Sequence, residues 1–137
     1  EHLTENLNNC TKAYIVFTTL GHRINDRINY YGGQFDTIRS LILDKVSIVG
    51  MDDINRQFKN WVNERENPYI ISTEVFTGEK DFGVESTPLL LNIFDNIDIE
   101  INEYNILNPI KTVVYILGIG KENNLVDKCL KCKNPCK

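Results

Sequence analysis

Histidine and cysteine, which supply many catalytic bases and metal ligands in proteins, are scarce in this sequence. Only two histidines and four cysteines occur among 137 residues. His2 and His22 lie near the same end of the chain and do not have the spacing of a metal-binding pair. We therefore expect no metal centre and no cofactor, and a catalytic site built on several histidines is excluded.

The sequence also lacks an excess of positive charge and lacks long apolar runs. Lysine and arginine number 15 against 19 acidic residues, which gives a formal net charge of −4. A chain of this charge has no field that would draw it onto a phosphate backbone, so we expect no nucleic-acid partner. The longest apolar run is about eight residues, well short of the ~20 that a membrane-spanning helix needs.

The middle of the chain contains no cysteine, and three of the four cysteines are crowded at its C-terminal end. Cys129 and Cys132 have the spacing of half a zinc knuckle, but a second pair of ligands is missing. A redox pair would need to lie at the start of a helix that follows a strand. The remaining interpretation is two disulfides, and full pairing then joins Cys10 to Cys129, Cys132 or Cys136, with the connectivity open.

Disulfides at the two ends of the chain predict a secreted or extracellular protein. Glu1 in place of methionine fits removal of a signal peptide, and Asn9 begins a glycosylation sequon, Asn9-Cys10-Thr11. We therefore expect residues 1–137 to form a single secreted globular domain with a disulfide-bonded C-terminal tail.

We predict that all four cysteines are oxidised in the native protein, because the tail offers no other set of ligands. The mass of the denatured protein should not increase on alkylation without a reductant. Four alkylated cysteines, or a retained metal ion, would contradict secretion.

Two apolar runs, 13–20 and 111–119, have the composition of strands that are buried on both faces. Residues 69–76 are rich in β-forming side chains, and residues 97–102 alternate strictly between isoleucine and polar residues. These patterns predict two further strands, and the strand at 97–102 should have one face in water.

Two stretches have the spacing of amphipathic helices. The first covers 34–46, and the second covers 52–65 with Asp52 as its N-cap. The residues expected to form the buried stripe of the second helix are Ile54, Phe58, Trp61 and Val62. The sequence thus predicts one α+β or α/β domain, with a mixed sheet whose central strands lie near 13–20 and 111–119, packed by helices near 34–46 and 52–65.

A polar segment, 77–83, contains one aromatic residue among glycines and charges. Aromatic side chains on such loops often anchor protein interfaces, so we take Glu79, Lys80, Asp81 and Phe82 as candidate partner-binding residues. The alternative is a hairpin turn in which Phe82 folds back onto the core.

The sequence favours a secreted, disulfide-stabilised, non-catalytic binding protein that engages a host or other extracellular protein partner. One alternative is a small secreted hydrolase that uses His22 with Asp26 or Asp36 as an acid–base pair. Another is a structural or adhesive ectodomain, which self-association in solution would reveal.

Overall fold

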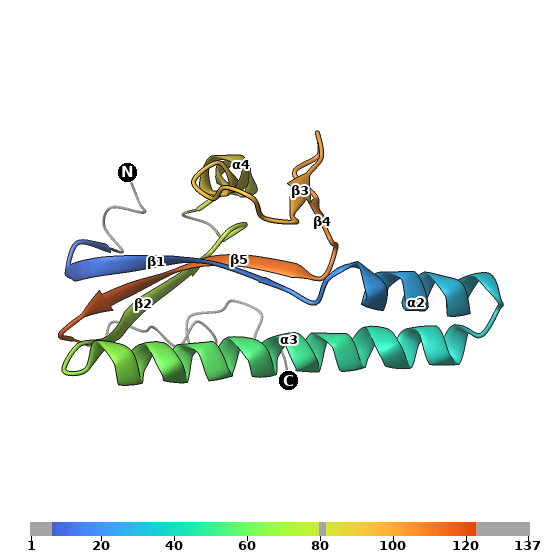
Figure 1. The fold of residues 1–137 in the computed structure, drawn as a ribbon, viewed down its shortest axis with the longest axis horizontal. Coiled ribbons are helices and arrows are strands. Elements are labelled where there is room, and N and C mark those ends of the chain that lie inside the picture. The colour runs from blue at the N-terminus through green and yellow to red at the C-terminus, as the bar shows by residue number, and fades with distance from the viewer. Residues whose placement is uncertain (1–6, 80–81, 123–137) are drawn as a thin grey trace, which may run out of the picture.

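A computed structural model describes residues 7–79 and 82–122, and these form a single α+β domain (Figure 1). The fold class and the single domain are as the sequence predicts. The elements in chain order are β1 (Cys10–Thr19), α2 (His22–Gly33), α3 (Thr37–Glu66), β2 (Ile70–Phe76), the 3-10 turn η1 (Val84–Ser86), α4 (Thr87–Leu91), β3 (Glu100–Ile101), β4 (Leu107–Asn108) and β5 (Thr112–Gly120).

The main sheet has three antiparallel strands in the order β1-β5-β2, so β5 alone is central. The side chains of β5 alternate between two apolar clusters, as a strand buried on both faces requires. Tyr115, Leu117 and Ile119 face α3, and Val114 and Ile116 face the opposite side, where α4 and the small sheet of β3 and β4 lie (Figure 1).

Three details of the sheet differ from the expectation. Every strand pair is antiparallel, so the sheet is not mixed. The run at 13–20 forms an edge strand, because β1 pairs with β5 on one side only. Within the predicted strand 97–102, only Glu100–Ile101 is extended, and it pairs with β4.

A glycine in the middle of β5 allows its neighbours to pack against the backbone. A Cβ atom added at Gly118 would lie 2.5 Å from Cys10 Sγ, 2.7 Å from Thr73 Cγ2 and 2.9 Å from Leu7 Cδ2. These separations are too short for carbon, so only glycine lets β1 and β2 flank β5 at this level.

One continuous helix of 30 residues, α3, replaces the two helices predicted at 34–46 and 52–65. Asp36 caps its start, since its Oδ1 accepts a hydrogen bond from the Arg39 amide at 3.2 Å. The expected N-cap, Asp52, lies inside the helix. Gly50 and Asp52 weaken a helix locally, but neighbouring Met51 is buried, and this packing outweighs the intrinsic preferences.

The C-terminal half of α3 covers one face of the sheet. Val62 is fully buried there, and Phe58 packs at the edge of the same cluster. Ile54 and Trp61, which were also expected in the core, are only about half buried, with 42% and 46% of their surface exposed. The predicted buried stripe is therefore half correct.

The last turn of α3 is tied to β1 by a buried carboxylate. Glu66 accepts hydrogen bonds from the Lys12 ammonium at 2.7 Å and from the Tyr14 hydroxyl at 2.5 Å. The bond from Lys12 is the main reason that the pKa of Glu66 lies below its usual value. This contact joins the start of the first strand to the helix end.

Candidate functional site: a groove along the free edge of β1

An open groove of about 660 Å³ follows the outer edge of β1. Residues 15–19 all line it, so the opening lies along the strand edge and not over one face of the sheet. Its size falls within the ~300–1,000 Å³ that binding sites usually enclose.

The backbone of β1 presents hydrogen-bonding groups to this groove. The Leu20 amide donates to the Lys111 carbonyl at 3.0 Å, and in an antiparallel pair the residues alternate between facing the partner strand and facing away. Leu20 faces β5, so the alternation makes the amides and carbonyls of Ile15, Phe17 and Thr19 point away from β5, toward the groove. Among the described residues, no backbone group pairs with those of Ile15 or Phe17.

Apolar side chains form both walls of the groove. Ile54 and Phe58 of α3 form one wall, and Phe94, Ile97 and Ile99, which follow α4, contribute to the other. The Phe94 ring packs edge-on against Phe17, with ring centroids 5.3 Å apart. A strand laid in the groove would therefore meet apolar surface on each of its two faces.

Natural sheets usually protect an exposed edge with charged residues, proline or a bulge. Residues 13–19 of β1 contain no charge and no proline, and the only irregularity in its pairing lies earlier, between Cys10 and Lys12. This edge is therefore open to another strand.

The opposite edge of the sheet, β2, is protected. Its pairing is interrupted between Ile71 and Thr73, and it carries a charged residue, Glu74, that forms an ion pair with Lys59 of α3. A hollow of about 690 Å³ beside it has several charged and amide side chains in its lining. Because Lys59 and Glu74 bind each other, this side offers a weaker site than the β1 edge.

The rim of the groove is acidic. Asp98 lines the groove and is 98% exposed, and Asp95 and Glu100 are exposed on the same segment. Asp98 Oδ2 lies 4.0 Å from His22 Nε2. This charge favours a ligand that carries basic residues beside its apolar ones.

The acid–base pair considered for His22 is not formed as expected. The carboxylate beside His22 belongs to Asp98, whereas Asp36 caps α3. The side chains of His22 and Asp98 are 46% and 98% exposed. Catalysis by His22 stays a prediction.

The loop at 77–83 does not present its aromatic residue to solvent. Phe82 is 6% exposed and packs with Val75, Leu90, Val114 and Ile116. This placement is the one that the alternative interpretation of the loop expects. Glu79 forms a bridge with Phe82 in the turn, while Lys80 and Asp81 lie outside the described residues. Partner binding by this loop stays a prediction.

Of the predicted disulfide and glycosylation residues, the structure describes Cys10 and Asn9. Cys10 is half-buried at the start of β1, and burial raises the pKa of its thiol. Asn9 is exposed in the preceding turn. Cys129, Cys132 and Cys136 lie outside the described residues, so the disulfides stay a prediction.

Comparison with known proteins assigns no relationship: no family model matches the chain, and no similar protein was found among curated sequences. No helix within 7–79 and 82–122 has the length and apolar character to cross a membrane. Over the same ranges, no three histidine, cysteine or acidic side chains are grouped as metal ligands would be.

Proposed function

We propose that this chain is a non-catalytic binding protein that captures an extended segment of a protein partner as an added strand along β1. The observation that carries the proposal is the outer edge of β1, which pairs with no strand among residues 7–79 and 82–122 and lies between two apolar walls. Strand addition of this kind takes its affinity from main-chain hydrogen bonds and its specificity from alternating side chains. The cysteine pattern supports an extracellular partner, such as a host protein.

The groove defines the chemistry of the segment that it accepts. Because both walls are apolar, side chains on both faces of the added strand should be apolar and preferably β-branched. Asp98 in the groove, with Asp95 and Glu100 exposed on the same segment, favours lysine or arginine at the ends of the segment that binds.

A labelled synthetic peptide tests this directly: six alternating valine and isoleucine residues between two pairs of lysines. One form carries N-methyl groups on alternate core residues, which blocks one edge of the peptide, and a second form carries them on all six. Strand addition uses the amides of one peptide edge only. We expect the first form to bind in fluorescence anisotropy titrations and the second to bind at least tenfold more weakly, since each lost hydrogen bond costs about 1 kcal/mol.

The protein side of the test uses two substitutions at one position. Ile15→Pro removes an outward amide but no amide that bonds to β5, and an edge strand tolerates proline at such a position. Ile15→Ala is the matched control, because it removes a similar amount of side chain and keeps the amide. Proline should weaken binding roughly tenfold more than alanine does. Equal binding by the two variants, or by the two methylated peptides, would show that no strand is added.

A further inference from the structure

A second apolar surface lies on α3, on the side that faces away from the sheet. We call it the outer face, and it consists of Phe35, which precedes the helix, and Ile38, Leu41, Ile42, Val46 and Val49. With 3.6 residues per turn, Ile38 lies directly opposite buried Ser47. Phe35 is 94% exposed and Ile38 73%.

The outer face ends abruptly within the same helix. Eighteen residues correspond to about five turns, so residues this far apart lie on the same side of the helix. Five turns beyond Ile38 lies Arg56, and the counterparts of Ile42 and Val46 are Asn60 and Glu64. The later turns thus have the polar exterior of an ordinary surface helix, whereas the earlier turns carry one exposed charge there, Lys45, among apolar side chains.

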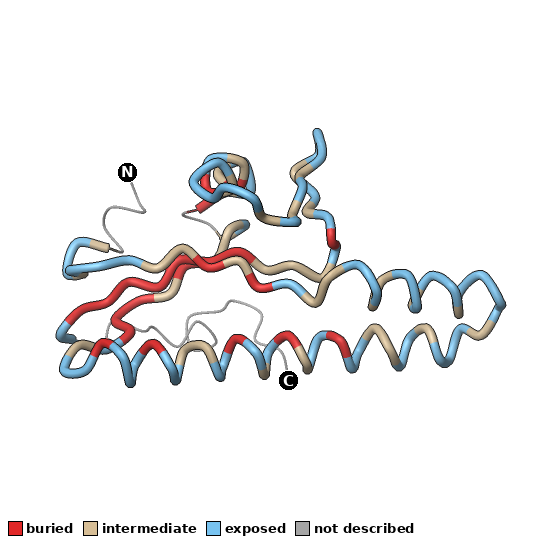
Figure 2. Tube along the Cα trace, viewed as in Figure 1, coloured by how far each residue is buried: buried red, intermediate tan, exposed pale blue. Residues whose placement is uncertain are grey.

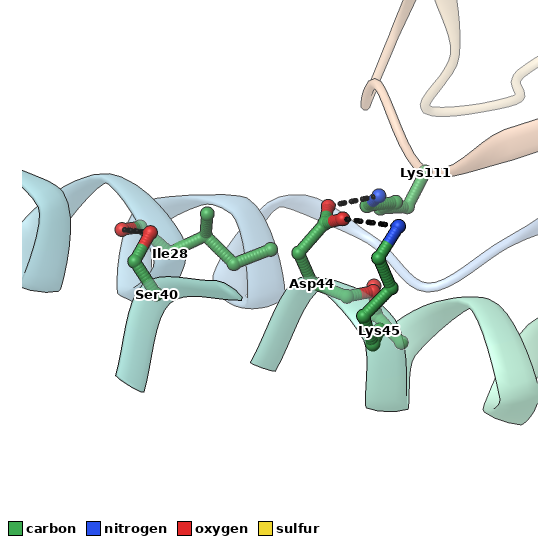
Figure 3. A network of polar contacts seen from close by, with 6 residues as sticks. Ile28, Ser40, Asp44, Lys45 and Lys111 are labelled. Carbon is green, nitrogen blue, oxygen red and sulfur yellow. Dashed lines mark hydrogen bonds and ion pairs between the residues drawn. The ribbon is translucent and has the colours of Figure 1, made fainter. Parts of the chain in front are cut away.

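The inner side of these earlier turns is polar, which is the reverse of the usual arrangement. Ser40 Oγ donates to the Ile28 carbonyl of α2 at 3.0 Å, and Asp44 accepts a hydrogen bond from Lys111 at 2.6 Å (Figure 3). Lys45 lies among the outer-face residues, where its side chain is 76% exposed, and it directs its ammonium toward Asp44, at 4.0 Å. The polar groups of this region therefore hold the helix to α2 and to the start of β5, while its apolar groups face water.

The hairpin of α2 and α3 lacks a core of its own. No residue of α2 is buried, and most of the hairpin beyond the sheet is exposed or half-exposed (Figure 2). Helices of this length are held in water mainly by packing of an apolar face and not by intrinsic preference. The hairpin therefore leaves its largest apolar surface without a partner among the described residues.

We propose that the outer face packs against the outer face of a second copy of this chain, so that the two α3 helices lie face to face across a two-fold axis. The six side chains expose on the order of 700 Å² of surface, which is within the range that each partner contributes to a stable dimer and exceeds the largest patch of most monomers. A two-fold axis brings this surface against itself, as the isologous interface of a dimer requires.

This pairing is independent of strand capture at the groove. The outer face looks away from the sheet, whereas the groove lies at the sheet edge beside β1. A dimer formed through the outer faces would carry two grooves, both open.

Analytical ultracentrifugation of the full chain tests the pairing with two matched variants. Ile42→Glu and Asn60→Glu each place one carboxylate on an exposed position of the same side of α3, about five turns apart. We expect the unaltered chain and Asn60→Glu to sediment at twice the 15.8 kDa chain mass at 100 µM. Ile42→Glu should sediment as a monomer, with the dimer dissociation constant raised at least 100-fold, and should bind the strand peptide with unchanged affinity.

Three results would overturn the proposal. A monomeric unaltered chain at 100 µM would mean that something other than a second copy covers the outer face. A dimer that both glutamate variants leave intact, or that both disrupt, would place the interface elsewhere. A dimer that Ile15→Pro abolishes and Ile42→Glu does not would show edge-to-edge pairing of β1.

Discussion

Replacing Leu117 with alanine should lower the free energy of unfolding by about 3–5 kcal/mol, the usual cost of truncating a leucine in a rigid core. Leu117 lies on the central strand β5, is fully buried, and packs in one cluster with Val62, Tyr115 and Ile119. Because β5 is bonded to a strand on each side, its backbone cannot move to fill the space that the lost side chain leaves.

Urea-induced unfolding followed by circular dichroism would measure this change. Leu89→Ala is the matched control, because it makes the same chemical change at a side chain of α4 that is mostly exposed, and it should cost less than ~0.5 kcal/mol. A loss below ~1 kcal/mol for Leu117→Ala would contradict the position of β5 at the centre of the core.

The second large effect is expected at Asn55, a buried polar residue that joins α3 to two strands. Its Oδ1 accepts hydrogen bonds from the Thr18 hydroxyl at 2.6 Å and from the Tyr115 hydroxyl at 3.1 Å. Burial raises the pKa of Tyr115, so its hydroxyl stays protonated and remains a donor. Asn55→Ala leaves both hydroxyls without this acceptor, and we expect a loss of about 2–5 kcal/mol.

A double-mutant cycle separates the hydrogen bond from the loss of packing. Tyr115→Phe removes one of the two donors, so in the Asn55→Ala background it should cost less than it does alone, by about 1 kcal/mol. If the two losses simply add, the residues do not share a bond.

Much of the fold could be predicted from local pattern. The apolar run at 111–119 is a central strand, the β-rich run at 69–76 is β2, and α3 ends where Asn67 and Pro68 follow it. Such patterns are reliable because side-chain alternation and helix-stopping residues act within a few positions of the chain.

The joining of two predicted helices into α3 was not predictable in this way. Gly50 and Asp52 favour a break, but Ser47, Met51 and Asn55 lie on one side of a continuous helix and are all buried. Contacts between residues far apart in sequence decided this point.

For the two candidate sites, too, some features follow from local sequence pattern and others only from tertiary structure. By itself, the sequence determined that the run at 13–20 is apolar on both faces and that residues 34–46 carry an apolar stripe. Only the tertiary structure decided that β1 lies at an edge, because strand order depends on pairing between distant segments. The tertiary structure also decided that the apolar stripe of α3 faces away from the sheet. Val62 and Asn55 pack against the sheet and so fix the rotation of α3 about its axis, and in a rigid helix this rotation determines the direction of every earlier turn.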